Sequence, residues 1–201
     1  MKLFTNPASP FCRKVEVLLH EAGMSELVTT QVVAGHPTDP GTLPITVNPI
    51  GKIPTLVTKK GAPLYDSRVI TRYLDAHGDV GFYAEDEIWN ILTLEATADG
   101  ISDAAVAMVY ESRSRPEDMQ YPPFVEGQWA KITRALDHIE TRWMDHLNGT
   151  LTMAHIAVAC ALGYLDFRHQ GRDWRDNRLK LTVWYAAFAE RPSMKATDPQ
   201  V

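Results

Sequence analysis

Residues 9–23 read SPFCRKVEVLLHEAG, and the first residues of this stretch combine a helix start with a candidate chemical site. Ser9 is a preferred N-cap and Pro10 suits the first helical position, so we expect a helix that ends at Gly23. A hydroxyl thus stands where a redox protein would place its first thiol, three residues before Cys12. Ser9 either caps the helix only, or also donates a hydrogen bond to a ligand's thiolate beside the positive helix end.

The segments around this helix alternate between strand and helix patterns. Strands are expected at KLFT (2–5) and VTTQVV (28–33), a hairpin at 54–65, and a second helix at 66–78. This order predicts helices packed on a small mixed sheet in residues 1–78. After a linker at 79–86, the hydrophobic period is helical, with helices expected near 87–112, 124–147, 153–169 and 176–190. The predicted fold class is an α/β domain followed by an all-α domain at 87–201.

Composition narrows the classes of protein that this chain could represent. Of its 201 residues 45% are hydrophobic, which suffices for a sizeable core, and the net charge of −5 argues against nucleic acid as the main partner. No apolar run is long enough to cross a bilayer, and the first residues lack a secretory signal pattern. The two cysteines, Cys12 and Cys160, do not suggest a disulfide framework, and no histidine stands at metal-ligand spacing from a convincing second ligand. We therefore expect a cytoplasmic protein without metal or membrane contact.

Two further stretches of the first domain are candidate binding segments. In NPIGKIPTL (48–56), Ile53 precedes Pro54 at the start of a strand, so the segment is either a plain loop or a cis Ile53–Pro54 bond that turns the Ile53 backbone toward an extended ligand. Asp66 and Ser67 begin the second helix, where they cap it and could also hold the carboxylate and ammonium of an amino acid. With Ser9, these segments suit a short acidic peptide that carries a thiol.

Six stretches in order make the chain resemble the glutathione S-transferases, especially bacterial members with a serine-type active site. They are residues 9–23, NPIGKIPTL, LYDSRVITRYLD (64–75), QWAKITRALDHIE (128–140), AHIAVACALGYLDFR (154–168) and RPS (191–193). The resemblance covers nearly the whole chain. It implies a thioredoxin-like glutathione-binding domain at 1–78, a helical domain at 87–201 that carries the pocket for a small electrophilic substrate, and a homodimer.

The resemblance also implies roles for individual residues. Ser9 would activate glutathione, which serves as co-substrate, and Asp66 with Ser67 would hold its γ-glutamyl end. Ile53, before the family's cis-proline Pro54, would hold the cysteinyl backbone. The remaining glutathione contacts implied are Phe11, His36 and Lys52, with Asp99 a possible contact across the dimer.

Near the end of the first long helix of the helical domain lie Tyr110 and Arg113. In the family this helix end overhangs the active site, and an arginine there could steer an anionic co-substrate; the alternative is a solvated, polar helix end. Tyr110 and Arg113 are therefore candidate residues of the electrophile pocket.

One departure from the family pattern concerns the helix expected at 153–169. Family members usually begin it with Ser/Thr-x-x-Asp, whereas here Thr152 is followed by His155 at the acidic position. Without the carboxylate we expect a weaker helix start, by about 1 kcal/mol, that His155→Asp would repair.

Three functions stay open on sequence alone. The first is a glutathione transferase that stabilises the glutathione thiolate for attack on an electrophile. The second is glutathione-dependent thiol-disulfide or lyase chemistry, which needs a reactive Cys12. The third is a non-catalytic ligand-binding member of the fold.

Overall fold

The computed structural model describes residues 1–200 and divides into two compact units. The first unit comprises Met1–Glu85 together with the chain from Pro192 onward, and the second comprises Asp86–Arg191. The first is a small mixed sheet with helices, and the second is all helical. The predicted fold class, a thioredoxin-like domain and a helical domain, is confirmed.

The sheet of the first unit has four strands, β1 (Lys2–Thr5), β2 (Thr29–Val32), β3 (Thr55–Val57) and β4 (Pro63–Leu64), in the order β2-β1-β3-β4. Strand β2 pairs parallel to β1, whereas β3 pairs antiparallel to β1 and β4 antiparallel to β3. Strand β1 is therefore an interior strand of the sheet, with β2 on one side and β3 on the other.

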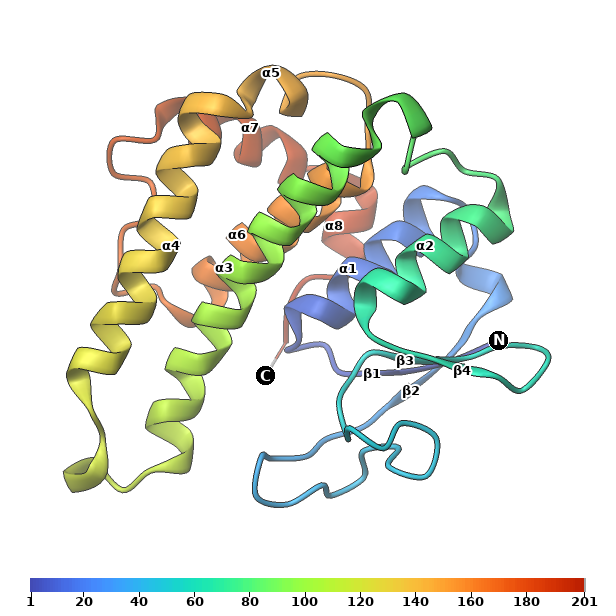
Figure 1. Cartoon of the computed structure of the whole chain (residues 1–201), viewed down its shortest axis with the longest axis horizontal. Coiled ribbons are helices and arrows are strands. Elements are labelled where there is room, and N and C mark those ends of the chain that lie inside the picture. Colours follow the sequence, from blue (N-terminus) through green and yellow to red (C-terminus); the bar gives the residue numbers. More distant parts are fainter. Residues whose placement is uncertain (201) are drawn as a thin grey trace. The chain divides into compact units, whose positions relative to one another are not determined.

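Helices α1 (Pro10–Glu21) and α2 (Ser67–Gly78) pack against each other beside the sheet (Figure 1). Apolar residues recur every three or four positions along both helices, which gives each helix one face for the core. The fully buried members include Val15 and Leu18 of α1 and Ile70 and Leu74 of α2. This packing fixes the direction of both helices relative to the sheet.

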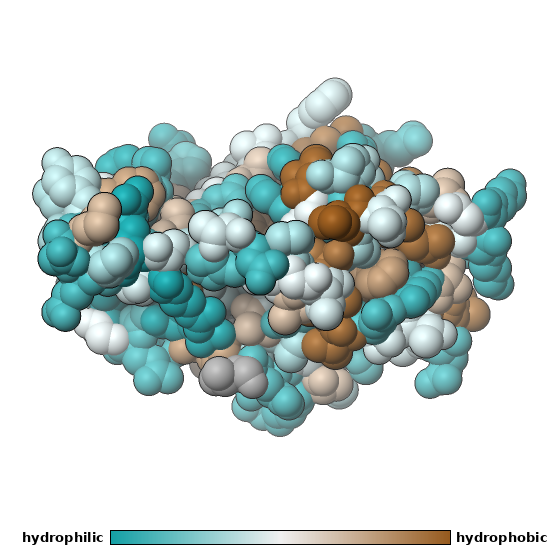
Figure 2. Space-filling view, turned by 90° about the horizontal axis from the view of Figure 1, so that it is seen from below, coloured by the Kyte–Doolittle hydropathy of each residue, from teal (hydrophilic) through white to brown (hydrophobic). Residues whose placement is uncertain are grey.

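The segment between β2 and β3 contains no strand, and the first unit exposes hydrophobic side chains there. This segment lies at the bottom of the picture in Figure 1. Figure 2 views the molecule from below and shows hydrophobic residues gathered on that face. The exposed large hydrophobic residues here are Ile45 and Ile50 of the segment, together with Val32 at the end of β2. The segment nevertheless has internal order, since Ala34 and Thr42 exchange backbone and side-chain hydrogen bonds.

The second unit is built on α3 (Ile88–Ser114), α4 (Pro122–Arg142) and α6 (Met153–Arg168), with α3 packed against both of the others. Shorter elements complete it: η2 (Glu85–Glu87) at its start, η3 (Glu117–Met119), α5 (Met144–Leu147) and α7 (Leu179–Ala189). Every residue from Met153 to Leu165 is buried, which explains why α6 is apolar on all sides. None of the helices in residues 1–200 is long and apolar enough to span a membrane.

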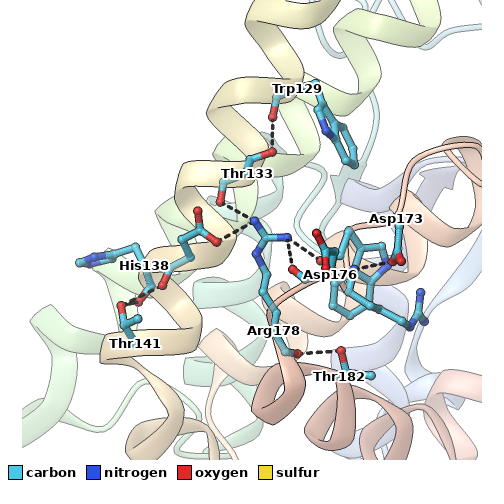
Figure 3. Close-up of polar contacts among 11 residues, drawn as sticks. Trp129, Thr133, His138, Thr141, Asp173, Asp176, Arg178 and Thr182 are labelled. Atoms are coloured by element: carbon cyan, nitrogen blue, oxygen red, sulfur yellow. Dashed lines mark hydrogen bonds and ion pairs between the residues drawn. The ribbon is translucent and has the colours of Figure 1, made fainter.

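Arg178 holds the loop between α6 and α7 against α4 (Figure 3). Its Nη1 donates to the carbonyl oxygens of Trp174 and Asp176 at 2.8 and 3.2 Å, and its Nη2 contacts Asp137 of α4 at 2.7 Å. Thr133 O of α4 accepts from the same Nη2 at 3.3 Å. One buried guanidinium therefore satisfies acceptors from both segments.

The start of α6 differs from the sequence expectation. Both halves of a capping box are present, because the N–H of Thr152 donates to Nδ1 of His155 at 3.1 Å. The unprotonated imidazole nitrogen thus accepts the hydrogen bond that a carboxylate accepts in the usual box. The expectation that the capping box lacks its second half is wrong, since a neutral histidine fills the acidic position.

The last helix, α8 (Pro192–Ala196), packs on α1 in the first unit. The buried guanidinium of Arg13 donates to the carbonyl of Met194 at 2.9 Å, and Met194 itself is 1% exposed. Ser193 also donates a hydrogen bond to the carboxylate of Glu21. The first unit therefore takes its core from both ends of the chain.

Candidate active site

Three candidate segments meet at one edge of the sheet of the first unit. Phe4, near the end of β1, pairs with Thr55 at the start of β3, so Pro54 lies beside the end of β1. Strand β4 runs antiparallel to β3, so it ends toward the same edge before Asp66. Helices α1 and α2 both begin here, which brings two positive helix ends to the site.

Ser9 is the N-cap of α1, as its residue type predicts. Its extended backbone (φ −94°, ψ 123°) places Oγ to accept the N–H of Cys12 at 3.3 Å. The turn before it is held by Asn6, whose Oδ1 accepts from Ala8 at 3.0 Å and whose Nδ2 donates to Val33 O at 2.9 Å. Capping uses Ser9 Oγ as an acceptor, so its hydroxyl hydrogen can be donated, either to the Cys12 thiol or to a ligand.

Cys12 lies one turn into α1 and is fully buried. Burial raises the pKa of its thiol to about 11, although hydrogen bonds from the Ser9 and Thr5 side chains and the Asn6 backbone act in the opposite direction. The charge of Glu16 adds to the rise. A thiol with this pKa is a poor nucleophile near neutral pH, as expected for a small buried side chain.

Ile53 is half-buried and is followed by a cis peptide bond to Pro54, which is the second of the two alternatives that the sequence left open. Within residues 1–200 neither the N–H nor the C=O of Ile53 takes part in a hydrogen bond. An extended ligand could pair with both groups in the manner of an added strand.

Asn48 positions this loop, and the sequence analysis missed its role. Its side chain is 1% exposed, and its Nδ2 donates to Lys52 O at 2.9 Å and to Thr55 Oγ1 at 3.0 Å. Its Oδ1 accepts from Ile50 N at 3.1 Å. The signal available in the sequence was only Asn before Pro, which indicates a turn but not which polar groups the amide would satisfy.

Asp66 and Ser67 begin α2. Asp66 is the N-cap and accepts from Arg68 N at 3.0 Å, while its second oxygen lies 3.2 Å from the Arg68 guanidinium. Burial opposes ionisation of Asp66, but the hydrogen bonds and charge of Arg68 and the charge of Lys14 outweigh it, so the pKa of Asp66 is lowered. A further cis peptide bond joins Tyr65 to Asp66.

Ser67 is 3% exposed and is the first residue of α2. Within residues 1–200 its N–H and hydroxyl donate no hydrogen bond. These two donors, next to the ionised Asp66, can hold a carboxylate and an ammonium group together.

The remaining residues predicted to contact glutathione lie in different parts of the first unit. Phe11 is half-buried in the first turn of α1, and Lys52 is exposed beside Ile53. His36 lies in the segment after β2, where it forms a bridge with Asp39 and its Nδ1 lies 2.9 Å from Thr38 Oγ1. Lys52 therefore belongs to the loop of the site, whereas His36 belongs to a separate turn.

Three predicted residues belong to the second unit, on α3. Asp99 is buried at 8% exposure, Tyr110 is half-buried and Arg113 is exposed. Among the residues that the structure describes, no group of three or more His, Cys, Asp or Glu side chains is placed to hold a metal ion.

Two family models match the chain. Residues 8–77 match the model described as "Glutathione S-transferase, N-terminal domain", and residues 122–187 match "Glutathione S-transferase, C-terminal domain". The first match contains the three candidate segments of the first unit, from Ser9 to Ser67.

Relatives match over the full length of the chain. The uncharacterized GST-like protein YibF of Escherichia coli K12 is 34% identical and covers 99% of this chain and 98% of its own. A glutathione transferase family member from Pseudomonas fluorescens Pf-5, crystallised with bound glutathione, is 45% identical over 100% of this chain and 99% of its own, with a TM-score of 0.96. A second structure from that source contains S-(propanoic acid)-glutathione and has 45% identity, full coverage of both chains and a TM-score of 0.91.

Proposed function

The chain belongs to the glutathione S-transferase family, and on this premise we propose that it is an active transferase whose serine-type site activates glutathione for attack on a small electrophile. The observation that carries the proposal is the free Ile53 backbone between two helix starts. That arrangement suits an extended peptide with a sulfur at one end and a charged group at the other. The Pseudomonas fluorescens relatives with glutathione and a glutathione derivative support the same ligand.

The residues of the first unit take roles that follow from their donors and acceptors. The Ile53 N–H and C=O pair with the cysteinyl backbone, and cis Pro54 completes that segment. Ser67 donates to the γ-glutamyl carboxylate and Asp66 attracts its ammonium. Phe11, Lys52 and His36 complete the proposed glutathione contacts.

Ser9 activates glutathione by donating a hydrogen bond to its sulfur. With its Oγ engaged by the N–H of Cys12, its hydroxyl can donate to a ligand sulfur placed at the helix start. A hydrogen bond to the thiolate favours that form over the thiol, and the dipole of α1 adds to this effect. The thiolate then attacks the electrophile, and the protein contributes position and a lower thiol pKa.

The alternative chemistry based on Cys12 is disfavoured. A thiol-disulfide or lyase mechanism needs an accessible thiolate, whereas Cys12 is fully buried with its pKa raised to about 11. The proposed thiol is therefore the ligand's own. We also propose a homodimer and a cytoplasmic setting, where glutathione is abundant.

Ser9→Ala and Ser9→Gly test this assignment. Both remove the hydroxyl donor, but glycine is tolerated at an N-cap, so it separates lost capping from lost chemistry. We expect kcat/KM with 1-chloro-2,4-dinitrobenzene to fall by roughly 10- to 100-fold in both variants, because a hydrogen bond to a charged group is lost. Glutathione binding, measured by calorimetry, should persist, and the thiolate absorbance of bound glutathione should appear only at higher pH.

Unchanged turnover in both variants would rule out the role given to Ser9. Ser67→Ala is the matched control, because it should weaken glutathione binding without shifting the pH at which the bound thiol ionises.

A further inference from the structure

The carbonyl group that precedes Ile53 is bound by two side chains of the first unit. The carbonyl oxygen of Lys52 accepts hydrogen bonds from Asn48 Nδ2 at 2.9 Å and from Thr55 Oγ1 at 3.0 Å. Asn48 Nδ2 also donates to Thr55 Oγ1 at 3.0 Å, so the three groups form a closed triangle. A carbonyl oxygen has two lone pairs, and both are used here. We call Asn48 and Thr55 the carbonyl clamp.

Both members of the carbonyl clamp are themselves held in place. Thr55 is fully buried in β3, where it pairs with Phe4 of the neighbouring strand β1. Asn48 is also buried, and its Oδ1 accepts the N–H of Ile50 at 3.1 Å, so its amide cannot turn freely. The Lys52 carbonyl is therefore fixed relative to the sheet, although Lys52 as a whole is exposed.

The direction of this carbonyl determines the direction of the N–H that follows it. Lys52 C=O and Ile53 N–H belong to one planar peptide unit, and because that unit is trans, the two groups point in opposite directions. The carbonyl points toward its buried donors, so the N–H of Ile53 points away from them. This N–H has no hydrogen-bond partner in the part of the chain that the structure describes. A donor that is already held in one direction loses little freedom when a ligand carbonyl binds to it.

We propose that Asn48 and Thr55 are positioning residues that direct the Ile53 N–H toward the carbonyl of the ligand's cysteine, so that the site prefers thiols whose cysteine continues into a peptide bond. This inference rests on the proposed function, because it states how that site selects its thiol. In this role neither side chain contacts the ligand, and both act through the Lys52–Ile53 peptide unit. A thiol without the carbonyl leaves the N–H unpaired and forgoes one hydrogen bond.

The first test uses the protein without ligand. Nitrogen-15 relaxation should give the Ile53 amide an order parameter of about 0.85, as in a rigid backbone, although its N–H is unpaired. The order parameter should fall toward the value of about 0.6 that marks a flexible backbone in Asn48→Asp and in Thr55→Val. Each substitution removes one donor to the Lys52 carbonyl at similar side-chain size. Thr55→Ser keeps the hydroxyl and should retain the wild-type value.

The second test compares glutathione with an isostere in which a trans-alkene replaces the amide between cysteine and glycine. The isostere keeps the thiol and the charged ends of glutathione but lacks the cysteinyl carbonyl. In calorimetry the wild type should bind glutathione about three- to tenfold more tightly than the isostere, which is the value of one hydrogen bond. This preference should shrink to about twofold or less in Asn48→Asp and Thr55→Val, mainly through weaker binding of glutathione, and should persist in Thr55→Ser.

Turnover of 1-chloro-2,4-dinitrobenzene separates this role from a general loss of structure. Both clamp variants should raise KM for glutathione by roughly three- to tenfold and leave kcat within about twofold, because Ser9 keeps its hydroxyl. Thr58→Val is the matched control, since Thr58 is also buried, directly follows β3, and its hydroxyl forms no hydrogen bond within residues 1–200. It should change neither the order parameter of Ile53, nor the preference for glutathione, nor KM.

Two results would overturn the inference. An unchanged order parameter of Ile53 in Thr55→Val, and in Asn48→Asp where that variant folds, would mean that the carbonyl clamp does not fix the amide. Equal affinity of the wild type for glutathione and the isostere, or an equal loss on both in the variants, would mean that the clamp does not select the ligand; turnover by the wild type then leaves the proposed function standing. A wild type that binds neither compound refutes the proposed function together with the preference, and the relaxation data still decide whether the clamp fixes Ile53.

Discussion

Ser9 and Cys12 lie three residues apart at the start of α1, and their surroundings give them opposite chemical properties. Ser9 is partly exposed at the helix start, where its Oγ accepts one N–H and its hydroxyl can still act as a donor. Cys12 is enclosed by the core, where burial outweighs the hydrogen bonds that would favour its thiolate. The side chain that can act on a ligand is therefore the hydroxyl.

The thiol of Cys12 should react slowly in the folded protein. Its pKa is raised from 9.0 to about 11, which leaves roughly a hundredfold less thiolate at pH 8 than an unperturbed cysteine would have. Cys160 is also buried, at 2% exposure, so both thiols should label with 5,5′-dithiobis(2-nitrobenzoate) only slowly. Unfolding in urea should release two fast thiols. A fast-reacting thiol in the native protein that disappears in Cys12→Ser would contradict this prediction and revive the redox alternative.

At the scale of one element, the start of α6 depends on the protonation state of His155. Nδ1 accepts the N–H of Thr152, so the ring is neutral and its proton lies on Nε2. Burial lowers the pKa of His155 to about 4, and the charges of His146 and Arg191 act in the same direction, against hydrogen bonding of the ring to the backbone carbonyls of His146 and Leu147. Protonation would remove the acceptor and charge a residue that is 3% exposed.

Stability should therefore fall as the pH is lowered through the range in which only the unfolded state protonates. The pKa is about 4 in the folded state against 6.5 for an ordinary histidine, so the unfolded chain binds more protons between these values. At about 1.4 kcal/mol per pKa unit, the free energy of unfolding should drop by roughly 3 kcal/mol between pH 6.5 and pH 4 from this residue.

Urea unfolding at several pH values measures this slope. His155→Gln keeps an acceptor for Thr152 without a titrating group, so it should flatten the slope, whereas the exposed His138→Gln should not. His155→Asp should give no gain in stability at pH 7, because the box is already complete. An identical pH dependence of the free energy of unfolding in wild type and His155→Gln would contradict the assignment of this effect to His155.

In the whole molecule, local sequence patterns were enough to predict the strands and helices. The assembly of the site depends on contacts between residues far apart in the sequence. The order of strands and helices followed from periodicity and from caps such as Ser9 and Asp66, because these are signals within a few residues. The meeting of Ser9, Ile53 and Ser67 needed the pairing of β3 and β4 with the sheet, which no short pattern encodes. The role of Asn48 depends on three partners within its own loop, so it emerged only from the structure.

The position of α8 shows the same limit. Its sequence gives no sign that it packs on α1, because the contact joins residues such as Arg13 and Met194, 181 positions apart. Arg13 is 5% exposed and also donates from Nε to Thr197 Oγ1 at 3.4 Å. A buried arginine of the first helix thus ties the last helix to the first unit.

Arg13→Gln should loosen α8 and lower the stability of the first unit. The shorter amide cannot reach the Met194 carbonyl, and we expect the free energy of unfolding to fall by about 1–3 kcal/mol, since a buried acceptor loses its charged donor. Hydrogen exchange followed by mass spectrometry should show faster exchange at 192–197 and at the facing part of α1, while α6 stays protected. Lys60→Gln, at an exposed position of the hairpin, is the control and should leave both segments unchanged. Unaltered exchange at 192–197 in Arg13→Gln would mean that the apolar contacts of Met194 alone hold α8, and that Arg13 does not join the two ends of the chain.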